Sequence, residues 1–141
     1  MSDIVIVGAG PAGLWAAHRL SKKHHITILE KRGFVGGSGL HSDGKLNFHP
    51  KIGGNLTEFM TPEEAWELNA EIKQHFKSLG VDLAHSDEEG LNQLEAEASR
   101  AGIKFVKIDQ NHIGSDYLPD VMGRMQDELV ERGVDIRLTT E

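Results

Sequence analysis

Hydrophobic positions in this sequence form two short apolar runs near its start and, further along, stripes with helical spacing. Residues 4–7 (IVIV) and 26–29 (ITIL) are rich in β-branched side chains, which indicates strands. The first run has no polar position, which predicts burial on both faces of a sheet. Between the runs, small side chains recur at helical steps, as expected of a helix packed closely on strands. These positions are Ala12, Gly13, Ala16, Ala17 and Leu20.

The middle of the chain carries two helix patterns, each with start and stop signals. Thr61 and Glu64 form a capping box around Pro62, and Gly80 marks the end of this helix. Its apolar stripe comprises Ala65, Leu68, Ile72, Phe76 and Leu79. Residues 86–89 (SDEE) predict a second capping box. The helix that follows ends at Gly102 and carries Leu91, Leu94, Ala98 and Ala101 on one face.

Three more elements are predicted towards the end of the sequence. Residues 103–108 (IKFVKI) combine apolar residues with two lysines that are expected to face outward, which predicts a short strand. Asp116 is expected to cap a helix over residues 117–132, and residues 134–138 are expected to form a third parallel strand beside the second. The inward side chains of this helix are Leu118, Val121, Met122, Met125 and Leu129. Together these elements predict an α/β fold of Rossmann type with local strand order 3-2-1.

A glycine motif joins the first predicted strand to its helix. Residues 8–13 (GAGPAG) fit the pattern G-x-G-x-x-G. Gly8 permits the tight turn, Gly10 lets a pyrophosphate approach the backbone, and Gly13 lets the helix lie against the sheet. The motif together with its flanking strands and helix is a much more specific signal than the glycine pattern alone.

The first turn of that helix is suited to bind an anion. Pro11 fits the first helical position, where its missing N–H costs no hydrogen bond, and Ala12 follows it. The free N–H groups and the helix dipole there favour negative charge. We therefore interpret residues 3–30 as an ADP-binding βαβ unit.

Glu30 lies at the carboxyl end of the second predicted strand, about 20 residues beyond the glycine turn. Its carboxylate can accept hydrogen bonds from an adenosine ribose and would repel a 2′-phosphate, which disfavours NADP at this site. Lys31 and Arg32 weaken that argument, because both could pair with a phosphate. The ribose acid does not by itself separate FAD from NAD.

Composition sets further bounds. The chain has 141 residues, 26% of them charged, and a net charge of −7, which argues against nucleic acid or an anionic membrane as partner. No apolar run approaches the ~20 residues of a membrane span and no leader precedes the first strand, so we expect a cytoplasmic protein. The absence of cysteine excludes a thiol redox pair within these residues. The eight histidines show no helical i, i+4 pair, so we expect no metal site.

The blocks described above resemble a known family. Residues 4–32 are similar to the amino-terminal fingerprint of FAD-dependent oxidoreductases with a glutathione-reductase-like FAD domain. Residues 36–54 and 111–141 resemble a group of FAD-dependent dehydrogenases related to geranylgeranyl-reductase-type flavoproteins. The resemblance implies FAD as cofactor, NAD(P)H as a candidate electron donor, and a flavin-dependent oxidoreductase as the whole protein. It leaves the substrate open.

Glycine-rich residues 33–54 form a long stretch without periodicity, which is typical of a functional loop or of a surface excursion. The resemblance implies that Gly36 and Gly37, and Lys31 before them, lie at the cofactor. Lys45 and His49 are weak candidates for a positive charge near reduced flavin and for an acid/base group. A solvated loop is at least as good an interpretation of both, and His112 is a weaker candidate for the same place.

We expect residues 1–141 to form the amino-terminal part of an FAD/NAD(P)-binding domain, with a mostly helical insertion over about residues 33–115. Such a chain would hold the ADP half of the site. It would need a carboxyl-terminal remainder, or self-association, to cover the flavin. Two other functions stay open: an NAD-binding domain of another dehydrogenase, and a dinucleotide-binding module without turnover.

Overall fold

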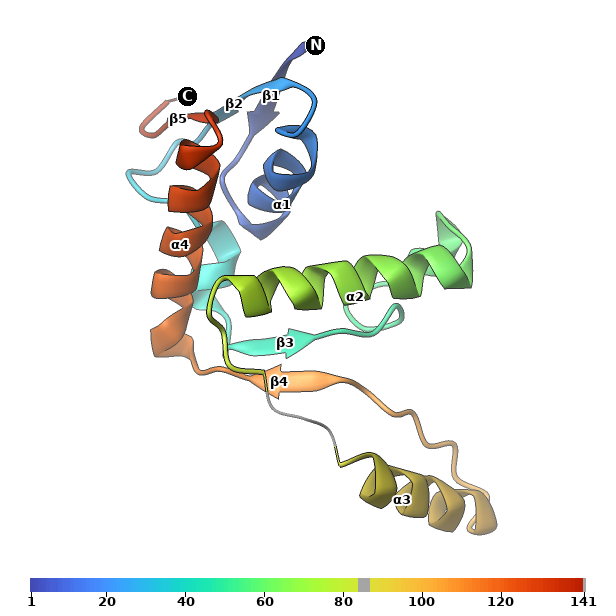
Figure 1. Ribbon diagram of the computed structural model, residues 1–141. Coiled ribbons are helices and arrows are strands. Elements are labelled where there is room, and N and C mark those ends of the chain that lie inside the picture. Colours follow the sequence, from blue (N-terminus) through green and yellow to red (C-terminus); the bar gives the residue numbers. More distant parts are fainter. Residues whose placement is uncertain (84–86, 141) are drawn as a thin grey trace. The chain divides into compact units, whose positions relative to one another are not determined.

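The computed structural model describes residues 1–83 and 87–140 (Figure 1). The chain divides into two compact units. The first comprises Met1–Gly44 and Gly114–Glu141, and the second comprises Lys45–Ile113. In the described part of the chain, no helix is both long and apolar enough to cross a lipid bilayer.

The first unit is built on a three-stranded parallel sheet. Its strands are β1 (Asp3–Val7), β2 (His25–Leu29) and β5 (Asp135–Arg137), in the order β1-β2-β5. Val5 pairs with Thr27 in β1–β2, and Thr27 pairs with Asp135 in β2–β5. The expected strand order and the Rossmann-type βαβ start are therefore confirmed.

Helices α1 (Pro11–Leu20) and α4 (Leu118–Glu131) pack against each other on one face of this sheet (Figure 1). Both connections run in the same direction through the strand order, so right-handed crossovers bring both helices to one face. The inward side chains predicted for α4 are all buried. From α1, Leu14 and Ala17 are fully buried.

The prediction that β1 is buried on both faces is wrong. Val5 is 60% exposed and Val7 85% exposed, whereas Ile4 and Ile6 are partly buried. The helices cover only the isoleucine face of β1 within the first unit. The uniformly apolar sequence of residues 4–7 thus does not indicate which face of β1 is covered.

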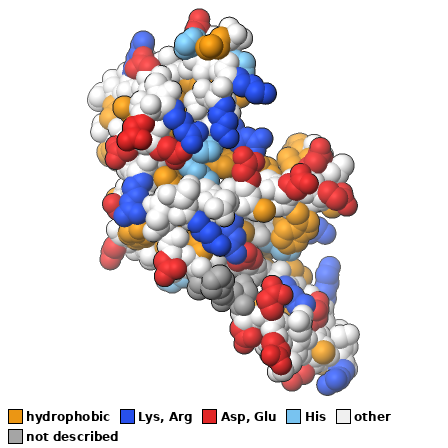
Figure 2. Space-filling view, viewed as in Figure 1, with side chains coloured by type: hydrophobic (Ala, Val, Ile, Leu, Met, Phe, Trp, Pro, Cys, Tyr) orange, Lys and Arg blue, Asp and Glu red, His pale blue; other side chains and the backbone are white. Residues whose placement is uncertain are grey.

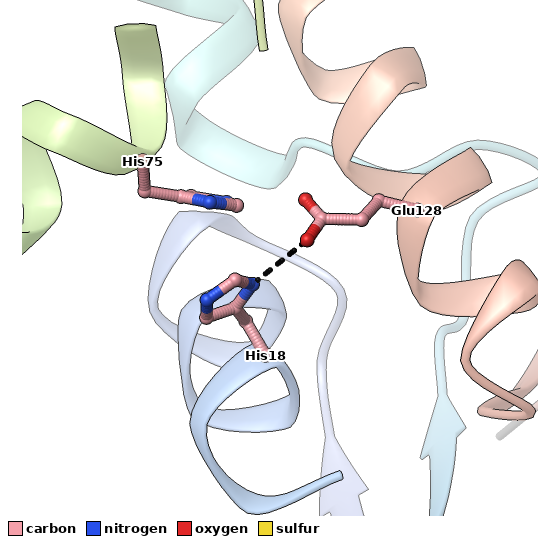
Figure 3. Close-up of side chains that lie close together, drawn as sticks. All are labelled: His18, His75 and Glu128. Carbon is pink, nitrogen blue, oxygen red and sulfur yellow. Dashed lines mark ion pairs between the residues drawn. The ribbon is translucent and has the colours of Figure 1, made fainter. Parts of the chain in front are cut away.

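His18 lies between the two helices, although its place beside Trp15 on the helix suggests an outward face. Its ring is only 7% exposed and stacks on Trp15 at a centroid distance of 5.0 Å. Figure 3 shows the ion pair between His18 Nδ1 on α1 and Glu128 Oε1 on α4, at 3.3 Å. Arg132 extends this link, because it pairs with Glu128 and donates to the backbone carbonyl of His18. α4 thus covers a polar group of α1 with polar partners of its own.

The expected cap of α4 is also wrong. A 3₁₀ turn, Ser115–Tyr117, runs directly into the helix, and Tyr117 at the cap position has helical φ and ψ of −89° and −16°. No side chain caps the helix. Because the chain is already helical before α4 begins, Asp116 has no extended cap position from which to bond the first N–H groups.

The second unit contains α2 (Pro62–Ser78) and α3 (Glu88–Arg100). The capping box of α2 is confirmed: the Thr61 hydroxyl accepts from the Glu64 N–H at 3.2 Å, and the Glu64 carboxylate accepts from the Thr61 N–H at 2.8 Å. For α3, Ser86 of the predicted box lies outside the described residues. Asp87 is the N-cap and accepts from the Gly90 N–H at 3.0 Å.

The strand predicted at residues 103–108 is not formed. That segment is extended but unpaired, and the strand β4 lies just beyond it at Gln110–His112. β4 pairs antiparallel with β3 (Lys45–Asn47). The Phe48 N–H continues the ladder by donating to the Asp109 carbonyl at 2.8 Å. The position of β4 along the chain is thus set by its pairing with β3 and not by the apolar pattern of residues 103–108.

α3 has no buried residue, and Leu94 on its apolar stripe is 51% exposed. Acidic side chains gather over this helix in Figure 2. The predicted helix exists, but its apolar stripe is covered only partly in the described structure.

Candidate functional site

The glycine turn leaves the first turn of α1 open to a ligand. Gly8 has a φ of +100°, and its N–H donates to the Leu29 carbonyl at 2.8 Å, so the turn is tied to the end of β2. Gly10 is the N-cap of α1 and has no side chain to cap the helix, and Pro11 follows in the first turn. Pro11 and Ala12 are both exposed. Among the residues that the structure describes, no side chain caps this helix end, so its N–H groups are open to a ligand.

Gly13 fixes how closely α1 lies on the turn. A Cβ placed on Gly13 would come within 2.0 Å of the Gly8 carbonyl oxygen, closer than any side chain can fit. Gly10 is different, since a Cβ there would make only an ordinary contact of 4.0 Å, with Gly37 Cα. Gly13 is thus needed by the fold itself, whereas the space in front of Gly10 is not filled by the protein.

Glu30 lies directly against the turn and is only 6% exposed. Its Oε2 accepts from the Ala9 N–H at 2.8 Å, and its Oε1 accepts from the Arg32 N–H at 2.9 Å. The backbone N–H groups, first that of Arg32 and then that of Ala9, hold the pKa of the Glu30 carboxyl below its ordinary value of 4.5. The side chain is therefore an anion that is fixed in place at the end of β2.

Gly36 and Gly37 approach the same turn from the loop after β2. The Gly36 N–H donates to the Ala9 carbonyl at 2.7 Å. Gly36 and Gly37 have φ values of +110° and +50°, and a Cβ on Gly37 would lie 3.0 Å from Gly10 Cα. The structure therefore brings the glycine pair and the glycine motif together, while Lys31, the residue after Glu30, is exposed.

Sequence reasoning missed Ala9. Its N–H binds Glu30 and its carbonyl accepts from Gly36, so it joins the two segments that flank the turn. Ala9 is fully buried. It occupies a variable position of the motif and acts through its backbone, so no side-chain signal in the sequence could have identified it.

The three weaker candidates lie in the second unit. Lys45 stands opposite His112 in the β3–β4 pair, so these two are neighbours. His49 lies beyond β3, where its ring meets Trp66 edge-on at 5.0 Å, and its Nδ1 accepts from the Lys51 N–H at 3.2 Å. The candidates thus form a pair and a separate histidine.

Comparison with known proteins gives the family. Residues 3–137 match the family described as FAD dependent oxidoreductase. Thiamine thiazole synthase of Pyrobaculum islandicum is 36% identical over 105 residues, which cover 74% of this chain and 37% of that protein. Thioredoxin reductase of Bacillus subtilis is 29% identical over 106 residues, 74% of this chain and 31% of that protein. The matched region thus spans about a third of these curated relatives.

Solved structures agree on the fold. An L-amino acid deaminase from Proteus vulgaris has a TM-score of 0.54 at 19% identity, over 97% of this chain and 39% of that chain. THI4 of Thermovibrio ammonificans has a TM-score of 0.51 at 16% identity, over 96% of this chain and 38% of that chain. The chain belongs to the FAD-dependent oxidoreductase family and forms part of its Rossmann-type FAD-binding fold.

Proposed function

We propose that this chain binds the ADP half of FAD at the glycine turn and so forms the cofactor-binding portion of a flavin-dependent dehydrogenase or reductase. The observation that carries the proposal is the Glu30 carboxylate, ionised and bonded to the Ala9 N–H within the turn. The proposed cofactor-binding residues are Gly8, Gly10, Pro11, Ala12, Gly13, Glu30, Lys31, Gly36 and Gly37.

The residues present fit this cofactor. Each Glu30 oxygen accepts one backbone N–H and keeps a lone pair with which it can accept a ribose hydroxyl. The open space at Gly10 and the uncapped first turn of α1 suit a pyrophosphate. The negative charge of Glu30 opposes a 2′-phosphate, so the site favours FAD over NADP.

Bound FAD supplies the redox chemistry, and the residues of this chain bind and orient its ADP half. We propose that the whole protein is longer, as its curated relatives are, and that its remaining part encloses the flavin and presents the substrate. The open valine face of β1 supports this, because a doubly wound sheet is covered on both faces. On this proposal the 141 residues alone bind FAD weakly and do not turn over.

Titration of the purified chain with FAD, NAD and NADP tests the cofactor assignment. FAD should bind saturably, with quenching of flavin fluorescence, and should stabilise the protein against thermal unfolding, whereas NADP should do neither. Glu30→Gln should weaken FAD binding by roughly 1–3 kcal/mol, the loss expected for charge-assisted hydrogen bonds. NAD binding tighter than FAD binding would move the chain to another dehydrogenase type.

The electron donor is a second part of the proposal. We propose NAD(P)H for this role in the whole protein, as the resemblance of residues 4–32 to FAD-dependent oxidoreductases implies. Anaerobic addition of NADH or NADPH to the flavin-loaded whole protein should bleach the flavin absorbance. A flavin that dithionite reduces but neither nicotinamide reduces would refute this assignment. It would leave FAD binding untouched.

A further inference from the structure

The second unit contains a pocket of about 420 Å³ that the proposed function does not use. Three segments form it: the loop after Phe48, the start of α2, and the extended residues 104–106. Its walls include His49, Lys51, Pro62, Trp66, Lys104 and Val106. This volume lies within the range of natural small-molecule sites.

One side of the pocket is aromatic and apolar. Trp66 is 50% exposed although it is the largest side chain of α2, and Val106 across the pocket is 46% exposed. The edge-on contact with His49 holds the Trp66 ring from the side. A flat apolar ligand lying on Trp66 would remove this surface from water and gain an aromatic contact.

The pocket is also positively charged. Among the residues that the structure describes, no carboxylate pairs with the ammonium group of Lys51 or Lys104, and no acidic side chain lines the pocket. Their neighbours behave differently: Lys73 pairs with Asp109, and Lys107 pairs with Glu95 at 2.6 Å. Two lysines that lack a carboxylate at one pocket are notable in a chain whose net charge is −7.

His49 adds a directed donor. Its Nδ1 accepts the Lys51 N–H at 3.2 Å, so the proton of the neutral ring is on Nε2. Two ammonium groups and one imidazole N–H are the donors that a carboxylate accepts, and charge-assisted bonds of this kind are the stronger ones.

We propose that this pocket binds a small organic acid with a planar apolar body, that is, an aromatic carboxylate. The ring lies on Trp66, and the carboxylate accepts hydrogen bonds from Lys51, Lys104 and His49. Every residue that this site uses belongs to the second unit, whereas the residues proposed to bind the ADP half of FAD belong to the first.

Benzoate is the probe, and the two tryptophans of the chain make the test specific. In ¹H–¹⁵N spectra of the full chain there are two indole signals, which the Trp66→Phe variant assigns. Benzoate should shift the Trp66 signal saturably and leave the Trp15 signal in place.

The double variant Lys51→Gln/Lys104→Gln should bind benzoate at least about tenfold more weakly, the loss expected when charge-assisted bonds are removed. The matched double variant Lys22→Gln/Lys23→Gln, in the first unit, should bind it unchanged.

Two further probes separate the parts of the proposal. Benzamide, the neutral isostere, should bind at least about tenfold more weakly than benzoate, because it lacks the charge. Inorganic phosphate should not displace benzoate at equal concentration, because it lacks the apolar body. Four results would each overturn the proposal. The Trp66 signal could shift linearly with benzoate concentration, without saturation, or benzamide could bind as tightly as benzoate. Phosphate could displace benzoate, or the Lys51→Gln/Lys104→Gln variant could keep full affinity for it. None of these results bears on FAD binding at Glu30.

Discussion

At the scale of single residues, Glu30 joins three segments of backbone. Its carboxylate binds the N–H groups of Ala9 and Arg32, its own N–H donates to the Arg137 carbonyl at 2.9 Å, and its carbonyl accepts from the Thr140 N–H at 2.9 Å. The proposed ribose ligand is therefore also a structural residue of the apoprotein. Substitutions at Glu30 should be tested with stability and cofactor affinity measured separately.

Glu30→Gln should lower the free energy of unfolding by about 1–3 kcal/mol near pH 7, because a buried backbone N–H loses its charged acceptor. The folded pKa of Glu30 lies below its ordinary value of 4.5, so its contribution is complete above that pH and is lost as the pH falls through the folded pKa. The difference between wild type and variant should therefore be constant from pH 7 to about 5 and shrink below about 4.5. Urea unfolding at several pH values measures it. A difference that stays constant down to pH 3.5 would contradict this role of the charge.

Gly10→Val should abolish FAD binding without unfolding the protein. A Cβ at Gly10 makes only an ordinary contact with Gly37 Cα, at 4.0 Å, so we expect the fold to tolerate it, whereas the branched side chain would fill the space proposed for the pyrophosphate. Far-ultraviolet circular dichroism checks the fold, and flavin fluorescence checks binding. Gly54→Val is the matched control, since nothing lies within 4 Å of a Cβ at Gly54. A Gly10→Val protein that still binds FAD as wild type does would show that the turn is only structural.

The sequence predicts the positions of the turn at this scale because G-x-G-x-x-G states a steric requirement. Gly13 confirms it most directly, with a Cβ that would come within 2.0 Å of Gly8 O. What the sequence could not show is the backbone bonding of Ala9 and Glu30. Any residue has an N–H and a carbonyl, so the bond from Ala9 to Glu30 depends on the fold and leaves no trace in side-chain identity.

At the scale of elements, the loop after β2 reaches the glycine turn at one hydrogen bond, from the Gly36 N–H to the Ala9 carbonyl at 2.7 Å. A short 3₁₀ helix, Gly37–His41, follows this bond. We expect FAD to increase the hydrogen-exchange protection of residues 33–44, because the cofactor would order both sides of the Gly10–Gly37 approach. Exchange measured with and without FAD tests this. α2 serves as the internal reference. Equal protection of the loop in both states would indicate that the loop is a surface segment that does not contact FAD.

Thr61→Ala should destabilise the second unit by about 1 kcal/mol, because it removes the hydroxyl that accepts from the Glu64 N–H. Urea unfolding followed by circular dichroism measures the loss. Ser99→Ala near the end of α3 is the matched control: it deletes the same hydroxyl where the side chain is exposed, and alanine favours helix. Equal stability of the Thr61 variant and wild type would show that the box contributes nothing to this unit.

Sequence patterns predicted helices better than the small sheet of the second unit, for a physical reason. α2 is specified by local signals: a capping box, Pro62, and Gly80 with a φ of +79°. β3 and β4 have three residues each, and their pairing joins positions more than 60 residues apart, so no local pattern can encode it. Residues 103–108 have the apolar composition of a strand, but they meet no partner strand in the described structure.

At the scale of the whole molecule, β1 is an edge strand with an open valine face within the first unit. We expect the 141-residue chain to self-associate, because this edge offers unpaired backbone groups and apolar side chains. The double variant Val5→Thr/Val7→Thr should shift sedimentation towards the monomer at equal protein concentration. Val130→Thr, a single substitution of the same kind at a position 54% exposed on α4, should leave the sedimentation unchanged. If both variants sediment as wild type does, another surface is responsible for any association.

The alternation in β1 has a consequence for folding. Ile4 and Ile6 face the helices while Val5 and Val7 face outward, yet isoleucine and valine differ by a single methylene, so a slip of one residue against β2 would bury almost as much apolar surface. The side chains of β1 therefore do not by themselves fix its register. The hydrogen bond from the Gly8 N–H to the Leu29 carbonyl does, since a shift of one residue against β2 would break it. The motif that serves the cofactor therefore also aligns the sheet. A substitution at Gly8, which has a φ of +100°, can therefore be expected to misalign the strands, whereas Gly10→Val should leave them aligned.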